Sequence, residues 1–255
     1  MTSIDCRTRV DVLGVPVDSL TVSELHEHLL RFVRTGARAT VLHANVHAVN
    51  LAGRYPWFRD ILRGADLVFC DGHGVMLGAR LLRQRLPEKI TYADWTWTLA
   101  ALCAREGWSL YLLGGTPGVA DAAARRLIRH APRLRIAGTH HGYFDKHDAS
   151  GENLAVIDAI NAARPDLLIV GFGMPIQEQW VSSNRDRIDA SVVLTGGAVF
   201  DYVSGRLRRP PRWMRVRGLE WLGRLLIEPR RLARRYVLGN PAFFARVVRE
   251  RLRNR

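Results

Sequence analysis

Cysteine is scarce in this chain of 255 residues, with only Cys6, Cys70 and Cys103 present. Three widely spaced cysteines cannot form a disulfide framework or a Cys-x-x-Cys zinc site, so we expect a reducing compartment. Long apolar runs are also missing: none approaches the roughly 18 residues of a membrane-spanning helix, and the N-terminus has no apolar core of a secretory signal. We therefore expect a chain that neither spans a membrane nor is secreted.

Several catalytic signatures are absent as well. Without GxGxxG or GxxxxGK[ST], a dinucleotide oxidoreductase and a P-loop kinase are disfavoured, and without GxSxG a hydrolase triad has no support. The histidines do not have the HExxH spacing of metal ligands, and no DxD segment is present to hold a divalent ion. We expect no bound metal and no cofactor.

Lysine is almost absent, because 36 of the 38 basic residues are arginines. From Gly205 to Arg255 there are 16 arginines, no lysine and three acidic residues, which gives this segment +13 of the total formal charge of +14. The remainder of the chain is therefore close to neutral. Such an asymmetry indicates a polyanionic partner for the tail, such as nucleic acid, an anionic membrane surface or a phosphate-bearing substrate.

Apolar residues make up 47% of the chain and charged residues 24%, which is typical of a globular protein. After a hairpin over 10–17 and a capped helix over 21–34, strands alternate with helices. The pattern predicts an α/β, Rossmann-like fold, with a mostly parallel sheet covered by helices on both faces. Strands are expected at 40–44, 66–70, 110–113, 135–138, 166–170 and 191–194.

The pattern changes near Gly205. The breaker Arg208-Arg209-Pro210-Pro211 is followed by three expected helices without a strand, at about 212–227, 229–238 and 241–252. We predict a Rossmann-like domain over 1–204 and a basic helical appendage over 205–255.

Polar residues and glycines follow several of the expected strands, where open α/β sheets bind their ligands. Glycines let the backbone approach a phosphate, and the helix that follows offers N–H donors. Each glycine pair alone is consistent with an ordinary tight turn, but together they favour a nucleoside-diphosphate site. The candidates are Asn45, Asp71, Gly72, Gly114, Gly115, Thr116, Gly142, Tyr143, Gly171, Phe172, Gly173, Gln177, Gly196, Gly197 and Asp201.

Two of these candidates have a structural alternative. Asp71 directly follows the apolar run LVFC, where it can act as a general base or cap the next helix. Gln177 lies after Met174-Pro175, where it either opens a helix or places its amide in the pocket as a substrate clamp.

Several segments together resemble the bacterial WecG/TagA/CpsF glycosyltransferase family over about residues 10–238. They are LHANVHAVNLA (42–52), ADLVFCDGHGV (65–75), YLLGGTPGVA (111–120), GYF (142–144), PDLLIVGFGMPIQEQW (165–180) and the long segment 195–236. The resemblance implies an inverting transfer of a sugar from a UDP-sugar to a polyprenyl-diphosphate-linked saccharide. Such enzymes build exopolysaccharide, teichoic acid linkage units or common antigen.

The resemblance also implies roles for individual residues. Asp71 corresponds to the general base, with Asn45 beside it in the acceptor pocket, while His43 stands where the family commonly has threonine and Lys89 where it often has arginine. The C-terminal segment resembles the part that closes the site with arginines, for which Arg209 and Arg212 are candidates. The UDP-sugar site would be lined by Gly114, Gly115, Gly142, Tyr143, Gly173, Gln177, Gly196, Gly197 and Asp201.

The competing interpretation is a non-catalytic protein whose basic tail binds nucleic acid or another anionic surface. Trp213, Trp221 and Tyr236 in the tail suit both nucleic acid and a membrane interface, but a nucleic-acid binder would not need Asp71 and Gln177 at one sheet edge. We therefore expect no nucleic acid as partner. We expect peripheral attachment to the cytoplasmic face of the inner membrane, and a homo-oligomer is possible. Of the arginines at 206, 208, 209, 212, 215 and 217, at least one would reach the UDP diphosphate. The others, with those at 230, 231, 234 and 235, would face anionic lipid.

Overall fold

The computed structural model describes residues 8–253 and contains a six-stranded sheet in the order β4-β3-β8-β7-β5-β6. The neighbours β3–β8, β8–β7, β7–β5 and β5–β6 all pair in parallel. The expected mostly parallel α/β fold is confirmed. The described residues fall into two compact units, which we call unit 1 (8–22, 43–91 and 208–253) and unit 2 (23–42 and 92–207).

Unit 2 contains the central strands of the sheet. Every residue of β5 (Ser109–Gly114), β7 (Leu167–Gly171) and β8 (Val192–Thr195) is buried, so both faces of these strands are covered. Such uninterrupted apolar strands are typical of parallel sheets between helical layers. On one face Leu113, Val170 and Val193 pack with Ile157, Ile160 and Trp180 of the helices α7 and α8.

The remaining elements of unit 2 follow the expected alternation, with one addition. Helix α9, directly after the Gly196-Gly197 turn, was not expected from the sequence, and it buries Val199, Phe200 and Val203. The bounds are α1 (Val22–Thr35), β3 (Ala39–Ala44), α5 (Tyr92–Glu106), α6 (Val119–His130), β6 (Arg135–His140), α7 (Gly151–Ala163), α8 (Ile176–Asn184) and α9 (Val199–Ser204).

Unit 1 begins with the predicted hairpin, formed by β1 (Arg9–Val12) and β2 (Val15–Asp18). Its turn residues Leu13 and Gly14 both have positive φ angles, 57° and 87°, which match the right-handed twist of a tight hairpin. The buried carboxylate of Asp18 accepts from the backbone N–H of Val68 at 2.7 Å and thereby joins the hairpin to β4. The elements that follow are α2 (Val46–Arg54), α3 (Pro56–Gly64), β4 (Leu67–Cys70) and α4 (His73–Leu81).

The C-terminal part of unit 1 contains helices and no strand within the described residues, as expected. The expected helix 212–227 is divided into α10 (Arg212–Val216) and α11 (Glu220–Ile227) by Gly218, whose φ of 75° no α-helix accommodates. The two helices expected at 229–238 and 241–252 are instead consecutive. They are α12 (Pro229–Ala233), a π-helical turn η2 (Arg234–Leu238) and α13 (Gly239–Arg253).

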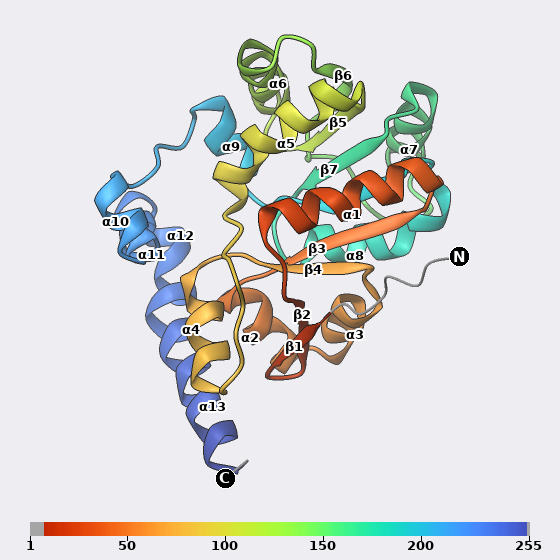
Figure 1. Cartoon of the computed structure of the whole chain (residues 1–255). Helices are drawn as coiled ribbons and strands as arrows, with labels where there is room; N and C mark the ends of the chain where they lie inside the picture. Colours follow the sequence, from red (N-terminus) through yellow and green to blue (C-terminus); the bar gives the residue numbers. More distant parts are fainter. Residues whose placement is uncertain (1–7, 254–255) are drawn as a thin grey trace. The chain divides into compact units, whose positions relative to one another are not determined.

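Helix α13 packs against α2 and α4 (Figure 1). Phe243 and Val247 are fully buried, and a Cβ at Gly78 of α4 would lie only 2.5 Å from the Phe243 ring. The glycine therefore lets the aromatic ring approach the α4 backbone. Through this packing the tail contributes side chains to the core of unit 1. The division into a domain over 1–204 and an appendage over 205–255 stays a prediction. None of the helices among residues 8–253 has the length and apolar character needed to cross a bilayer.

Replacing Phe243 by alanine should lower the free energy of unfolding by about 3–5 kcal/mol, because it removes a fully buried aromatic side chain. Urea unfolding monitored by circular dichroism measures this change. Val248→Ala on the exposed side of the same helix is the matched control and should change stability by less than about 0.5 kcal/mol. Equal effects of the two variants would contradict the packing of α13.

Candidate active site

Asp71 and Asn45 follow neighbouring strand ends in unit 1. The backbone N–H of Asp71, just after β4, donates to the carbonyl of Ala44, the last residue of β3, at 2.9 Å. Asn45 caps α2, because its side-chain oxygen accepts from the backbone N–H of Ala48 at 3.0 Å. The capping bond occupies the oxygen, so the amide NH₂ is the end of Asn45 that can donate to a ligand.

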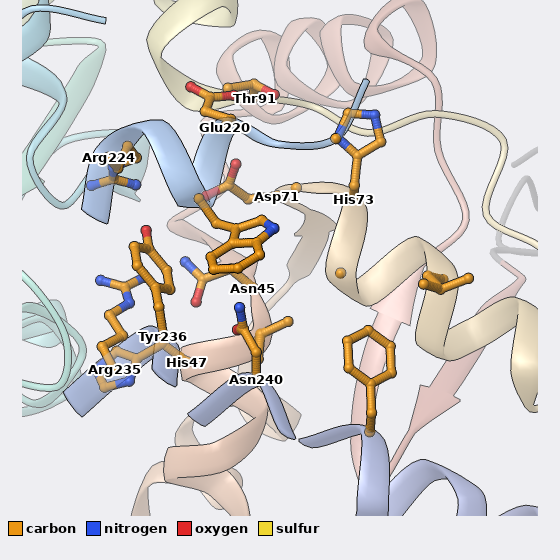
Figure 2. Close-up of a pocket in the computed structure, with 17 residues that line it drawn as sticks. Asn45, His47, Asp71, His73, Thr91, Glu220, Arg224, Arg235, Tyr236 and Asn240 are labelled. Carbon is orange, nitrogen blue, oxygen red and sulfur yellow. The ribbon is translucent and has the colours of Figure 1, made fainter. Parts of the chain in front are cut away.

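These two residues line a cavity of about 260 Å³ that lies wholly within unit 1 (Figure 2). The rest of its wall comes from the β4–α4 junction and from α11, η2 and α13. Among the described residues, no side chain hydrogen-bonds the Asp71 carboxylate, so both of its oxygens can accept from a ligand. The polar lining residues are Asn45, His47, Asp71, His73, Thr91, Glu220, Arg224, Arg235, Tyr236 and Asn240.

Two arginines of the C-terminal helices, Arg224 and Arg235, line this cavity together with Asp71 (Figure 2). Burial lowers the pKa of Arg235, the nearby charge of Arg224 acts in the same direction, and the charges of Tyr236 and Asp71 oppose them. The guanidinium nevertheless stays protonated in any ordinary solution. Its Nε is buried and has no hydrogen-bond partner among the described residues, while the Arg235 side chain lines the cavity. An anion is the complementary ligand.

The position of Arg235 corrects the expectation that it faces anionic lipid. The helical phase that buries Leu232 and Tyr236 also turns Arg235 toward the cavity, through the π-helical turn η2. The sequence already contained a sign of this helical phase, because the apolar residues Leu232 and Tyr236 are four positions apart.

Two histidines of the cavity are held neutral. Burial, with a smaller contribution from Arg235, lowers the pKa of His47 to about 4. Burial lowers the pKa of His73 first, Lys89 lowers it further, and Glu220 opposes both. Lys89 thus lies close enough to influence the β4–α4 junction, although it does not line the cavity itself.

The two arginines proposed for substrate binding lie in different surroundings. Arg209 donates to the Glu220 carboxylate at 2.7 Å, and Glu220 lines the cavity, so Arg209 supports its rim. Arg212 is exposed at the start of α10 and does not line the cavity. Their substrate-binding roles stay predictions.

One wall of the cavity is apolar. Trp221 packs edge-on against Tyr236, with ring centroids 6.1 Å apart, and Leu77 and Phe244 continue this wall. Leu77 is 48% exposed, so the apolar surface extends from the cavity to the solvent. A carboxylate, two arginines and an apolar wall together suit a ligand that is both anionic and apolar.

The predicted glycine-rich loops lie in unit 2. A Cβ at Gly114, at the end of β5, would lie 2.4 Å from the Gly171 carbonyl oxygen, so this glycine allows close strand contact. Gln177 is fully buried, and its Oε1 accepts from the backbone N–H groups of Gly173 at 3.1 Å and Gly197 at 2.9 Å. Its amide therefore connects the loops after β7 and β8 instead of projecting as a clamp.

The other predicted residues have varied surroundings. His43 is only 4% exposed and stacks on Phe69, away from the cavity lining. Tyr143 is 69% exposed beside Gly142, and Asp201 in α9 lies 3.8 Å from Arg206. Gly115 and Gly196 pack against Val119 and Val199 at the helices that follow them.

Sequence reasoning missed most of the cavity wall. Arg224, Glu220 and Asn240 carried no motif that separates them from a solvated helix face. These residues share a position on the partly buried side of C-terminal helices. That position indicates a cavity only when it is known which part of the protein the helices pack against.

A model of the glycosyl transferase WecG/TagA/CpsF family matches residues 10–255, so the chain belongs to this family of glycosyltransferases. The chain is similar to the N-acetylglucosaminyldiphosphoundecaprenol N-acetyl-beta-D-mannosaminyltransferase of Staphylococcus aureus strain NCTC 8325 / PS 47. The two are 28% identical over 228 residues, which cover 89% of this chain and 87% of the relative. The protein of the same name from S. aureus strain MW2 is 27% identical with the same coverage.

Acidification should destabilise the folded protein partly through His47. Its pKa is about 4 when folded and near 6.5 when unfolded, so below about pH 6.5 the unfolded chain binds the extra proton. Between about pH 7.5 and pH 5, wild type should lose about 1–2 kcal/mol more than His47→Gln, allowing for partial exposure. Urea unfolding at both pH values measures the difference, with the exposed His147→Gln as control. Parallel losses in wild type and His47→Gln would contradict the assignment.

Proposed function

We propose that this glycosyltransferase transfers a sugar from a UDP-sugar to a polyprenyl-diphosphate-linked saccharide, with inversion at the anomeric carbon. The observation that carries the proposal is the Asp71 carboxylate in a cavity that also presents arginines and an apolar wall. The printed name of the S. aureus relatives, which describes a transfer to N-acetylglucosaminyldiphosphoundecaprenol, supports it. The product belongs to a cell-surface polysaccharide of the exopolysaccharide, teichoic acid linkage or common-antigen type.

In this proposal Asp71 is the general base. The acceptor hydroxyl gives its proton to an Asp71 oxygen while its own oxygen attacks the anomeric carbon. The new glycosidic bond forms as the bond to the UDP oxygen breaks, and UDP leaves with that electron pair. Asn45 can orient the acceptor through its amide NH₂. One base and no covalent intermediate are sufficient for inversion.

The cavity wall suggests how the acceptor binds. Arg224 and Arg235 are placed to hold a diphosphate close to the base, since guanidinium groups form strong paired hydrogen bonds with phosphate oxygens. Leu77, Trp221 and Phe244 then offer an apolar path for the start of the prenyl chain. A nucleic-acid ligand would make no use of this apolar wall.

For the donor we propose the loops of unit 2. Backbone N–H groups at strand ends and helix starts can stabilise the leaving diphosphate, as they do in other nucleotide-binding α/β proteins. Cationic side chains are proposed to do the work that a metal does in other transferases. The residues proposed to line the UDP-sugar site are Gly114, Gly115, Gly142, Tyr143, Gly173, Gly196, Gly197 and Asp201, and the buried Gln177 is proposed to hold the loops of Gly173 and Gly197 in place.

The surface of α10–α13 suggests peripheral attachment to the cytoplasmic face of the inner membrane. Large apolar side chains are exposed there among arginines, an arrangement typical of helices that lie in a bilayer interface. Each arginine near an anionic surface contributes about 1 kcal/mol. The exposed apolar residues are Trp213, Val216, Trp221, Leu226, Ile227, Val237, Leu238, Val248 and Leu252.

Asp71→Asn should reduce the rate of sugar transfer by about two to four orders of magnitude, because it removes the proton acceptor. Affinity for UDP and the unfolding free energy should stay close to wild type. Transfer to a short-chain lipid-linked acceptor measures the rate, and Asp60→Asn on the exposed side of α3 is the control. Turnover of Asp71→Asn near the wild-type rate would refute the assignment of the base.

Replacing the exposed Leu226 and Leu238 together by serine should release the protein from vesicles that contain anionic lipid. Each of these residues is more than 60% exposed on the C-terminal helices, at 72% and 63%. Sedimentation with vesicles measures binding. Binding should also weaken in about 1 M salt, because ions then screen the attraction between the arginines and the anionic lipid beyond about 3 Å. Leu154→Ser in α7 is the control. Undiminished pelleting of the double variant would place the membrane-binding surface elsewhere.

A further inference from the structure

Glu178 is a buried carboxyl group that the proposed mechanism does not use. It lies in the first turn of α8 in unit 2, with 1% of its surface exposed. Its Oε1 accepts from Gln177 Nε2 at 2.7 Å. Burying a carboxyl group is costly, so a tolerated one calls for a physical reason.

The reason lies in the neighbouring amide. Gln177 Oε1 accepts from two backbone N–H groups, those of Gly173 and Gly197. If the amide were flipped, its NH₂ group would point at these two donors and both hydrogen bonds would be lost. Glu178 Oε1 can accept from Nε2 but not from an oxygen of the flipped amide. The two backbone donors and the Glu178 acceptor therefore favour the same orientation of the amide, the one that connects the two loops.

Both connected glycines border open space. Gly173 and Gly197 have φ angles of 87° and 58°, and a Cβ at either would meet no atom within 4 Å. A ligand can therefore approach the backbone of both loops. The spacing of the two loops is fixed by the single oxygen of Gln177, which accepts at 3.1 and 2.9 Å.

We propose that Glu178 is a positioning residue for the nucleotide: it locks the Gln177 amide so that the loops after β7 and β8 are held at the spacing that a UDP-sugar requires. The inference rests on the proposed function for the identity of the ligand. The lock itself rests only on the hydrogen bonds within unit 2.

The protonation of Glu178 is consistent with this role. Burial raises its pKa to about 7, while hydrogen bonds from Gln177, its own backbone and Thr195 act against the increase. No charged side chain contributes to the shift. Accepting one hydrogen bond from an amide does not require a negative charge, so glutamine at this position should preserve the lock, whereas an apolar residue should not.

The test compares Glu178→Gln with Glu178→Leu. UDP affinity of Glu178→Gln should stay within about threefold of wild type. Glu178→Leu should bind UDP about tenfold more weakly and raise the KM for the donor by a similar factor, with little change in the KM for the acceptor, since an unpaired buried amide costs about that much. Titration calorimetry and steady-state kinetics measure these values. Gln179→Leu, on the exposed side of the same helix, is the matched control.

Hydrogen exchange separates this inference from the proposed function. Without ligand, the backbone amides of Gly173 and Gly197 should exchange at least about tenfold faster in Glu178→Leu than in wild type and Glu178→Gln. Gln177→Met, which removes the shared acceptor directly, should have the same effect if Glu178→Leu does not fold. Unchanged exchange or UDP affinity in folded Glu178→Leu would overturn the lock, as would equal losses in Glu178→Gln. Failure of wild type to bind UDP would overturn the proposed donor and leave the exchange result to decide on the lock.

Discussion

The hydrogen bond from the Asp71 backbone to the Ala44 carbonyl is the contact on which the candidate site depends. It sets the ends of β4 and β3 side by side, so that a carboxylate and a capping amide open into one cavity. Both strands are apolar and buried at almost every position, which leaves their carboxyl ends as the place where polar side chains reach a ligand. The position of the Asp71 carboxylate is thus a consequence of sheet packing.

The second feature of the cavity is positive charge in the same wall as the Asp71 carboxylate. The C-terminal helices supply it, because packing of Phe243 and Val247 on unit 1 fixes the phase of α13 and of the π-helical turn before it. Arg235 is desolvated there, while the neutral His47 avoids adding a further positive charge. An anionic group in the cavity could replace the solvation that Arg235 has lost, which agrees with the proposed role of this arginine in binding a diphosphate.

In unit 2, packing and hydrogen bonds position the glycine-rich loops in a similar way. Gly114 permits the strands to approach, and Gln177 joins two loops through a single oxygen that a buried carboxyl group keeps in place. Strand-end glycines are common in nucleotide-binding proteins because they expose backbone donors. The buried hydrogen bonds of Gln177 can hold the two loops, and with them their backbone donors, in a fixed arrangement before a ligand binds.

The sequence by itself determined the parallel α/β fold, the helical basic tail and the family, because buried strands, amphipathic helices and the motifs around Asp71 and Gln177 are local patterns. It also identified Asp71 and Asn45 as strand-end residues. Only the tertiary structure decided that Arg235 lines the cavity, that Gln177 connects two loops, and that Glu178 is buried beside it. Helical phase and hydrogen-bond partners depend on which distant segments pack together, and a linear pattern does not contain that information.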